Sequence, residues 1–197
     1  TSILSIIILG LSINWLAASL LAFTIFFYAV VYTIWLKRHT VQNIVIGGAA
    51  GAFPPIIGHI CATGSIGIEA LILFLIIFLW TPPHFWALAL INKSDYRVAK
   101  IPMLPIVYGD MTTRKNIFIY SLLLMPCAYL PWILNYSGNF YVIVVTLLNI
   151  EFIRRSISVL KENKDSEKGL FVYSIFYLSI LFASICFDKL ISNFMIG

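Results

Sequence analysis

The chain has 197 residues, of which 61% are hydrophobic and 11% are charged. A soluble domain of this length carries about a quarter charged residues, so the composition excludes an ordinary water-soluble globular protein. The formal net charge is +5, but the basic residues cluster in a few short connections between apolar segments. This topological distribution excludes the continuous basic face of a nucleic-acid-binding protein.

Seven apolar segments, in chain order, predict membrane-spanning helices. They cover residues 1–13, 15–36, 44–62, 66–91, 117–136, 139–153 and 170–192. No long polar stretch, low-complexity linker or internal repeat divides them. We therefore expect one integral membrane domain over residues 1–197, with an all-α, polytopic helix-bundle fold. The first segment ends at Asn14, short of the roughly 20 residues that a bilayer requires, so we expect the chain to enter a longer protein midway through a helix.

Twelve of the 13 Lys and Arg residues lie in alternate connections between these segments. This is the positive-inside pattern, which places the basic connections in the cytoplasm. We expect residues 37–43, 92–116 and 154–169 to be cytoplasmic. An excess of Ile, Lys and Asn is typical of AT-rich bacterial genomes and favours a bacterial inner membrane. The twelve residues are Lys37, Arg38, Lys93, Arg97, Lys100, Arg114, Lys115, Arg154, Arg155, Lys161, Lys164 and Lys168.

The three cysteines indicate neither a metal site nor a disulfide framework. Cys61, Cys127 and Cys186 each lie inside an apolar segment and show no CxxC spacing. We therefore expect all three to be buried small hydrophobic residues.

The second segment ends in YAVVYTIWLKRHT. Tyr28, Tyr32 and Trp35 are spaced i, i+4 and i+7, which predicts one aromatic face on an α-helix. Lys37 and Arg38 follow at the membrane boundary, where two adjacent cations can hold an anionic headgroup or a diphosphate. An aromatic belt with positive-inside anchors is the alternative interpretation.

The third segment is rich in small residues and contains a proline pair. Gly47 and Gly51 form a GxxxG pattern, which lets helices approach closely. Pro54 and Pro55 predict a break near the middle of the segment, which is compatible with the wall of a pocket. His59 lies near the outer end, and we expect it to be structural.

The fourth segment carries the most polar groups for a membrane helix. Pro82 and Pro83 cannot donate to the preceding turn, and His84 lies roughly 10 Å below the boundary at Ile91. An intramembrane histidine is expected to face the protein interior. If the helix continued, Asp95 would share a face with His84. Both residues also have a purely structural interpretation. His84 could donate a hydrogen bond to a carbonyl freed by the prolines, and Asp95 could be a solvated helix cap.

In the last third of the chain we predict only local structural roles. Asp110 and the two threonines that follow it are candidate caps for the fifth span. Glu151 is spaced for an ion pair with Arg154 or Arg155 across one helical turn.

Two long stretches, YTIWLKRHTVQNIVIGGAAGAFPPIIG and FLWTPPHFWALALINKSDYRVAKIPMLP, closely resemble the protoheme IX farnesyltransferases (heme O synthases), a family within the UbiA prenyltransferase superfamily. The resemblance implies nine helices around a cavity that opens laterally to lipid, of which the seven segments here correspond to helices three to nine. It implies transfer of a farnesyl group from farnesyl diphosphate to a vinyl group of heme B, with release of diphosphate.

The resemblance also implies a set of site residues and a magnesium ion held between two acidic motifs. Asp95 matches the second acidic motif and is expected to bind Mg²⁺, while Lys37 and Arg38 match a basic pair that holds the diphosphate. The first motif, NxxxDxxxD, and an RTxxRP segment are absent from the printed sequence, and we expect them before Thr1. The further substrate contacts expected are Tyr32 and Trp35 beside the farnesyl cation, His84 at the heme, and Tyr96 and Arg97.

Two alternatives to heme farnesylation stay open at this point. One is a prenyltransferase of the same superfamily that acts on another aromatic acceptor. The other is an inactive remnant that binds heme or lipid and lacks the first acidic motif. The expected partners are heme B, farnesyl diphosphate and the lipid bilayer, with a heme A synthase or a terminal oxidase assembly factor as a protein partner.

Overall fold

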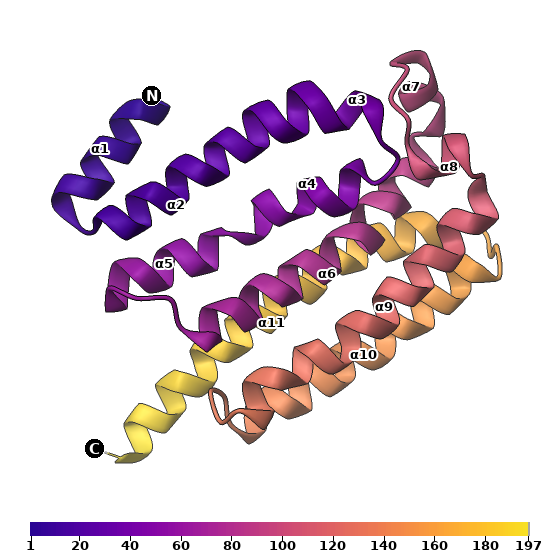
Figure 1. Cartoon of the computed structure of the whole chain (residues 1–197). Helices are drawn as coiled ribbons and strands as arrows, with labels where there is room; N and C mark the ends of the chain where they lie inside the picture. Colours follow the sequence, from indigo (N-terminus) through magenta and orange to yellow (C-terminus); the bar gives the residue numbers. More distant parts are fainter. Residues whose placement is uncertain (197) are drawn as a thin grey trace.

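The computed structural model describes the backbone of residues 1–196 and the side chains of residues 1–191. Every regular element within this range is a helix, so the all-α prediction is confirmed (Figure 1). The elements are α1 (Ser2–Ser12), α2 (Trp15–Phe26), the π-helix η1 (Phe27–Leu36), α3 (Lys37–His39), α4 (Asn43–Ala52), α5 (Pro54–Thr63), α6 (Ile68–Ile91), α7 (Lys93–Val98), α8 (Leu104–Val107), α9 (Asp110–Ile133), α10 (Asn139–Leu160) and α11 (Ser166–Ile196).

Helices occupy all seven predicted segments, but they differ in their capacity to cross a bilayer. Within the described residues, five are long and apolar enough: Trp15–His39, Asn43–Thr63, Ile68–Ile91, Asp110–Ile133 and Ser166–Ile191. Helix α1 has only 11 residues. Helix α10 has 22 residues but carries Glu151, Arg154 and Arg155 in its C-terminal half, so each stretch of it long enough to cross a bilayer contains three charged side chains.

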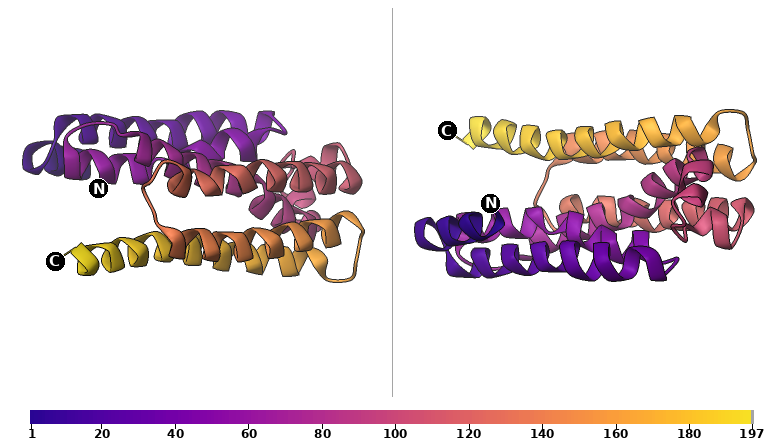
Figure 2. Two further views of the ribbon diagram at one scale, coloured as in Figure 1. Left: turned by 90° about the horizontal axis from the view of Figure 1, so that it is seen from below. Right: turned by 90° about the horizontal axis from the view of Figure 1, so that it is seen from above.

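Helix α6 occupies the centre of the bundle. It packs against α4 and α5 on one side and against α9 and α11 on the other. Figure 2 shows α1 to α5 in one layer, and α10 and α11 in a second layer across from it. The main core lies where α6, α9, α10 and α11 meet, and its fully buried side chains include Trp86, Ile117, Phe152 and Tyr177.

The two ends of the bundle have different charge. The connections after α3, around α7 and α8, and between α10 and α11 lie together at one end (Figure 1). Twelve of the 13 lysines and arginines lie in these connections or within about two turns of them in the adjoining helices, and we call this end the basic end. The chain termini lie at the opposite end. The arrangement agrees with the alternating pattern on which the topology prediction rests.

Several local predictions are refined by the structure. The proline pair at Pro54 does break the third segment, since Phe53 separates α4 from α5. Glu151 pairs with both Arg154 and Arg155, each at 2.6 Å. The prediction that Asp110 caps the fifth span is wrong: α9 starts earlier than predicted, Gly109 takes the cap position, and no described side chain caps the helix. The Asp110 carboxylate instead accepts a hydrogen bond from Lys93 at 2.6 Å.

The three cysteines are free thiols, but the prediction that all are buried is wrong. Cys61 and Cys127 are half-buried, and Cys186 is exposed. Cys186 lies on α11, and an exposed apolar position on a membrane-spanning helix faces lipid, where a small hydrophobic side chain is as well accommodated as in a protein core.

Candidate functional site

A cavity of about 390 Å³ opens among η1, α4, α6 and α7, and we call it the main cavity. Three of the predicted site residues, Tyr32, Lys37 and Tyr96, line it. The rest of its wall comes from small and apolar residues of α4 and from one face of α6. The full lining is Tyr28, Tyr32, Lys37, Ile44, Gly47, Gly48, Gly51, Ile77, Trp80, Thr81, Phe85, Tyr96 and Met103.

The main cavity changes character along its length. Lys37 and Tyr96 lie at the basic end, where α3 and α7 begin. Gly51 and Ile77 lie deeper in the bundle, because Gly51 is seven residues, or about 10 Å, along α4 from Ile44. A ligand that fills this space needs a polar or anionic head at the basic end and an apolar tail toward the membrane interior.

Two glycines of α4 let other side chains approach its backbone. A Cβ atom at Gly47 would overlap the ring of Tyr32, and one at Gly48 would lie 2.8 Å from Cγ2 of Thr81. Both distances are shorter than side chains tolerate, so these glycines fix where Tyr32 and Thr81 lie in the cavity wall. At Gly51, by contrast, an added Cβ would meet nothing within 4 Å. The GxxxG pattern therefore serves side-chain packing at Gly47 and leaves open space at Gly51.

The π-helix η1 divides the predicted aromatic face. Tyr28 and Tyr32 stay together, with ring centroids 5.5 Å apart, and both line the main cavity. Trp35 is 63% exposed and does not line the main cavity, so the structure does not bring it together with Tyr28 and Tyr32. In an α-helix seven residues make nearly two full turns. The wider turn of a π-helix leaves residue i+7 well short of that, which rotates Trp35 away from Tyr28.

A second, smaller hollow of about 260 Å³ adjoins the main cavity at the basic end. Tyr96 lines both spaces. Every charged residue in the wall of this hollow is a cation: Arg38, Arg97 and Lys100. We call it the cationic hollow. Arg38 and Arg97 were predicted site residues, whereas Lys100 had been counted only for topology. No sequence signal separated Lys100 from other basic residues of the same connection.

Tyr96 is suited to donate a hydrogen bond to an anion in either space. Burial raises the pKa of its phenol above the ordinary value, and the neighbouring carboxylate of Asp95 raises it further. The hydroxyl group therefore stays protonated at physiological pH. A neutral phenol between Lys37 and the cations of the hollow offers a donor without adding negative charge.

Asp95 is isolated from other metal-binding side chains. It is exposed on α7 and accepts a hydrogen bond of 3.3 Å from the Ser94 hydroxyl. Among the residues that the structure describes, no group of three His, Cys, Asp or Glu could hold a metal ion. Asp95 can therefore supply only one of the ligands of a magnesium ion, and this fits the usual arrangement in which one or two carboxylates hold Mg²⁺ together with substrate phosphates.

His84 is buried as predicted, but it does not share a face with Asp95. Helix α6 ends at Ile91 and Asn92 leaves the helical conformation, so α7 starts in a new direction. The His84 side chain is 8% exposed and lies between the rings of Trp80 and Phe171, at centroid distances of 4.4 and 4.7 Å. Because Trp80 lines the main cavity, His84 stands directly behind the cavity wall.

The hydrogen bonds around His84 assign its tautomer. Nδ1 lies 2.6 Å from the Ser174 hydroxyl oxygen, and that hydroxyl donates to the carbonyl of Phe171. Since the single proton of Ser174 is used there, Nδ1 must carry the hydrogen that donates to Ser174. The Nε2 atom then keeps its lone pair, and no described residue bonds to it. The alternative prediction, a hydrogen bond to a freed carbonyl of the same helix, is replaced by this contact with α11.

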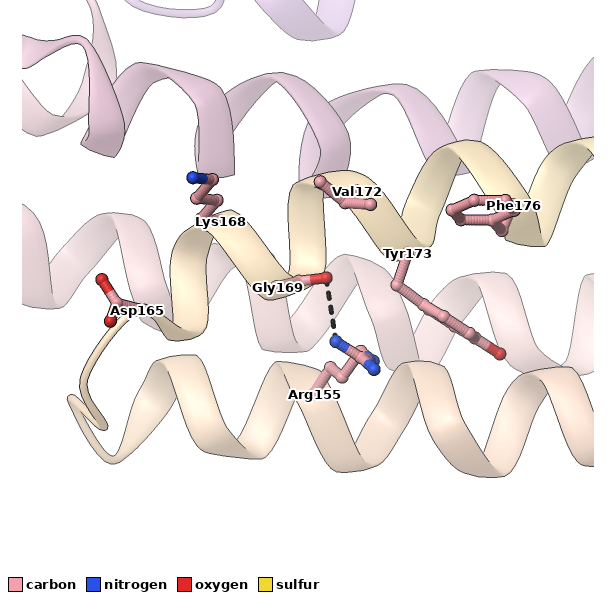
Figure 3. A pocket seen from close by; sticks show the side chains of 7 residues that line it. All are labelled: Arg155, Asp165, Lys168, Gly169, Val172, Tyr173 and Phe176. Atoms are coloured by element: carbon pink, nitrogen blue, oxygen red, sulfur yellow. Dashed lines mark hydrogen bonds between the residues drawn. The ribbon is translucent and has the colours of Figure 1, made fainter.

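A further hollow of about 340 Å³ lies between α10 and α11 (Figure 3). Its most polar residue, Arg155, donates to the carbonyl of Gly169 at 3.1 Å, pairs with Glu151 and lies 4.9 Å from the centroid of the Tyr173 ring. The guanidinium group is therefore used in joining the two helices. We interpret this hollow as structural.

Comparison with known proteins relates this architecture to one family. Residues 1–181 match the UbiA prenyltransferase family. The chain is 53% identical to "Protoheme IX farnesyltransferase 2" of Mesorhizobium japonicum, over 98% of this chain and 63% of the relative. It is 51% identical to "Protoheme IX farnesyltransferase" of Brucella ovis, over 96% of this chain and 62% of the relative. The chain thus spans less than two thirds of the length of these relatives. No solved structure matches it.

Proposed function

The chain belongs to the UbiA prenyltransferase family, and on this basis we propose that it transfers a farnesyl group from farnesyl diphosphate to a vinyl group of heme B, giving heme O for terminal oxidases. The observation that carries the proposal is the main cavity, whose polar end adjoins the cationic hollow and whose other end is apolar. An isoprenoid diphosphate has the same polarity. The names of the similar bacterial proteins support heme as the acceptor.

The cations at the basic end would stabilise the leaving group. When the allylic C–O bond breaks, negative charge develops on the diphosphate oxygen. Lys37 lines the main cavity, and Arg38 and Arg97 line the adjoining cationic hollow, so all three would lie on the side of the diphosphate. Fixed cations and the Tyr96 hydroxyl act on this charge without reorganising during the reaction. Lys100 supplies a fourth cation.

The aromatic residues of η1 would stabilise the positive charge that develops on the farnesyl carbon. The farnesyl carbon becomes cationic as the diphosphate leaves, and an aromatic face stabilises a nearby cation by about 0.5–2 kcal/mol. Tyr32 is held against Gly47 and adjoins Tyr28 in the cavity wall. We therefore place the reacting end of the farnesyl chain near Tyr32. Heme B would approach from the lipid side of the cavity, and its vinyl group would form a C–C bond to the cationic carbon. Water would then add to the cation left on the vinyl carbon and lose a proton, which gives the hydroxyl group of the product.

Magnesium is proposed as a cofactor with Asp95 as one of its ligands. Bound to the diphosphate, the ion would neutralise part of its charge. Because no group of three His, Cys, Asp or Glu among the described residues could hold a metal ion by itself, most of the remaining ligands would be oxygens of the diphosphate.

His84 is proposed to contact the heme through Nε2. Its Nδ1–H bond to Ser174 fixes the ring, and the rings of Trp80 and Phe171 hold both of its faces. A histidine oriented by a hydrogen bond at one nitrogen presents the other as a ligand, which is the usual arrangement at metal centres. A role in heme binding rather than in bond breaking is favoured, because farnesyl transfer requires no chemistry at the iron.

The five membrane-spanning helices make the chain a multi-pass membrane protein. We propose that it resides in a bacterial inner membrane with the basic end in the cytoplasm. Heme O made there would be passed on to a heme A synthase or to a terminal oxidase assembly partner.

A direct assay tests the proposed function. The full-length natural polypeptide that carries this chain is reconstituted in lipid nanodiscs with heme B, farnesyl diphosphate and Mg²⁺, and the products are separated and identified by mass spectrometry. Formation of hydroxyethylfarnesyl heme supports the proposal. Farnesylation of a quinone precursor in place of heme would identify a different acceptor. Heme binding without consumption of farnesyl diphosphate would identify a non-catalytic protein.

A further inference from the structure

The deep end of the main cavity is bounded by a residue without a side chain. Gly51 lies on the same face of α4 as Ile44, Gly47 and Gly48, and it is the farthest of the four from the basic end. Gly47 and Gly48 are glycines because Tyr32 and Thr81 occupy the space next to them. No such neighbour explains Gly51, since an added Cβ there would meet nothing within 4 Å. Gly51 is exposed and lines the main cavity, so the open space beside it adjoins the cavity.

The opposite wall at this depth comes from α6. Ile77 lies one turn deeper along α6 than Thr81, and both line the main cavity. The distance between the residue-51 and residue-77 side chains therefore sets how much apolar space remains beyond Tyr32. A larger residue at position 51 would shorten the cavity from its deep end without reaching Lys37 or Tyr96.

We propose that Gly51 is a specificity-determining residue that sets the length of the isoprenoid chain the cavity accepts. This inference rests on the proposed function, because it assumes that the cavity binds an isoprenoid diphosphate with its head at the basic end. The last isoprene unit of a farnesyl chain lies beside Gly51 and Ile77. A geranyl chain, one unit shorter, ends before it reaches them.

Binding of two unreactive analogues tests the inference without requiring catalysis. Farnesyl thiodiphosphate and geranyl thiodiphosphate are titrated calorimetrically against the full-length natural polypeptide in nanodiscs. Gly51→Val fills the deep end, so it should weaken farnesyl binding on the order of tenfold and leave geranyl binding within about twofold. Ile77→Ala enlarges the same end and should improve binding of geranylgeranyl thiodiphosphate relative to the farnesyl analogue.

Gly58→Val is the matched control, because Gly58 also has nothing within 4 Å of an added Cβ but is not part of the described lining of the main cavity. It should change neither affinity. Thermal unfolding, followed by tryptophan fluorescence, verifies that each variant is folded. If Gly51→Val does not fold, Gly51→Ala provides the smaller substitution and should shift the farnesyl-to-geranyl ratio in the same direction.

The possible failures are distinguishable. If the folded Gly51 variants keep the wild-type ratio of farnesyl to geranyl affinity, or if both affinities fall equally, the inference is overturned and the proposed function stands. If the wild-type protein binds neither thiodiphosphate, the proposed function fails and the inference fails with it.

Discussion

At the scale of single residues, the site depends on where side chains are absent. Tyr32 reaches the cavity wall only because Gly47 has no Cβ to displace its ring. The same ring adjoins Tyr28, so a small shift of Tyr32 would disturb both aromatic faces. A position occupied by glycine in an otherwise ordinary helix thus has a direct effect on the chemistry proposed for its neighbour.

Gly47→Ala should weaken binding of farnesyl thiodiphosphate by displacing Tyr32. Inserting a methyl group into a packed contact costs about 1–3 kcal/mol. If the free protein avoids this cost by moving the Tyr32 ring and the bound protein cannot, the affinity should fall by roughly 5- to 150-fold. Gly58→Ala is the control, since the added methyl group there meets no neighbour. Calorimetric titration measures both variants. Equal affinities for the two would show that the Tyr32 ring moves aside without consequence.

His84→Phe should separate packing from heme binding. Phenylalanine keeps an aromatic ring between Trp80 and Phe171 but has no nitrogen atom, so the fold should persist while the iron loses its ligand. The expected result is loss of the histidine-ligated Soret band on heme titration, with a melting temperature near that of the wild type. His59→Phe, at the other end of the bundle, should leave the spectrum unchanged. An unaltered Soret band in His84→Phe would exclude His84 as an iron ligand.

Ser174→Ala should affect the same histidine indirectly. It removes the acceptor of the Nδ1–H group, and a buried donor without a partner costs about 1–3 kcal/mol. Thermal unfolding in nanodiscs should show that loss of stability. The heme affinity should fall less than in His84→Phe, because Nε2 is still present. A melting temperature equal to that of the wild type would contradict a stabilising hydrogen bond between His84 and Ser174.

At the scale of elements, the π-helix η1 decides which aromatic residues belong to the site. It keeps Tyr28 and Tyr32 in the cavity wall and leaves Trp35 exposed. Tyr32→Leu should therefore reduce farnesyl transfer by about 2- to 30-fold, while Trp35→Leu should stay within about twofold of the wild type. Product formation is measured under identical heme and farnesyl diphosphate concentrations. A larger effect for Trp35 than for Tyr32 would contradict the geometry of η1.

Apolar patterning predicted the elements well, because a long run of hydrophobic residues has one stable arrangement in a bilayer. The sequence did not predict the local departures from regular helix. Nothing in FYAVVYTIWL distinguishes a π-helix from an α-helix, since both satisfy the same apolar pattern. The sequence around Asn92 also contains no proline or glycine that would end a helix. This is why a continuous helix, with Asp95 on the face of His84, was a reasonable expectation. Of the predicted site residues, Tyr32, Lys37 and Tyr96 line the main cavity and Trp35 does not, while the role of each stays a prediction.

At the scale of the whole molecule, the fold joins connections that are distant in the sequence. Lys37 follows η1, whereas Tyr96 and Met103 come from the connection between α6 and α9, and all three line one cavity. The basic connections meet at the same end of the bundle (Figure 1). Some of the basic residues that orient the protein in the membrane thus also line the cationic hollow. The predicted orientation therefore also predicts the side of the membrane from which the diphosphate binds.

That orientation can be measured with two nearly isosteric substitutions at the ends of one helix. Ser65 and Ser94 are exposed residues that flank α6, whose 24 residues extend about 36 Å, more than the roughly 30 Å hydrocarbon core. In a background without Cys61, Cys127 and Cys186, a membrane-impermeant maleimide should label Ser65→Cys in intact spheroplasts. It should label Ser94→Cys only after permeabilisation. The reverse pattern would put Lys37 and the cationic hollow on the outer surface, away from the cytoplasmic supply of farnesyl diphosphate, and the proposed direction of substrate entry would fail with it.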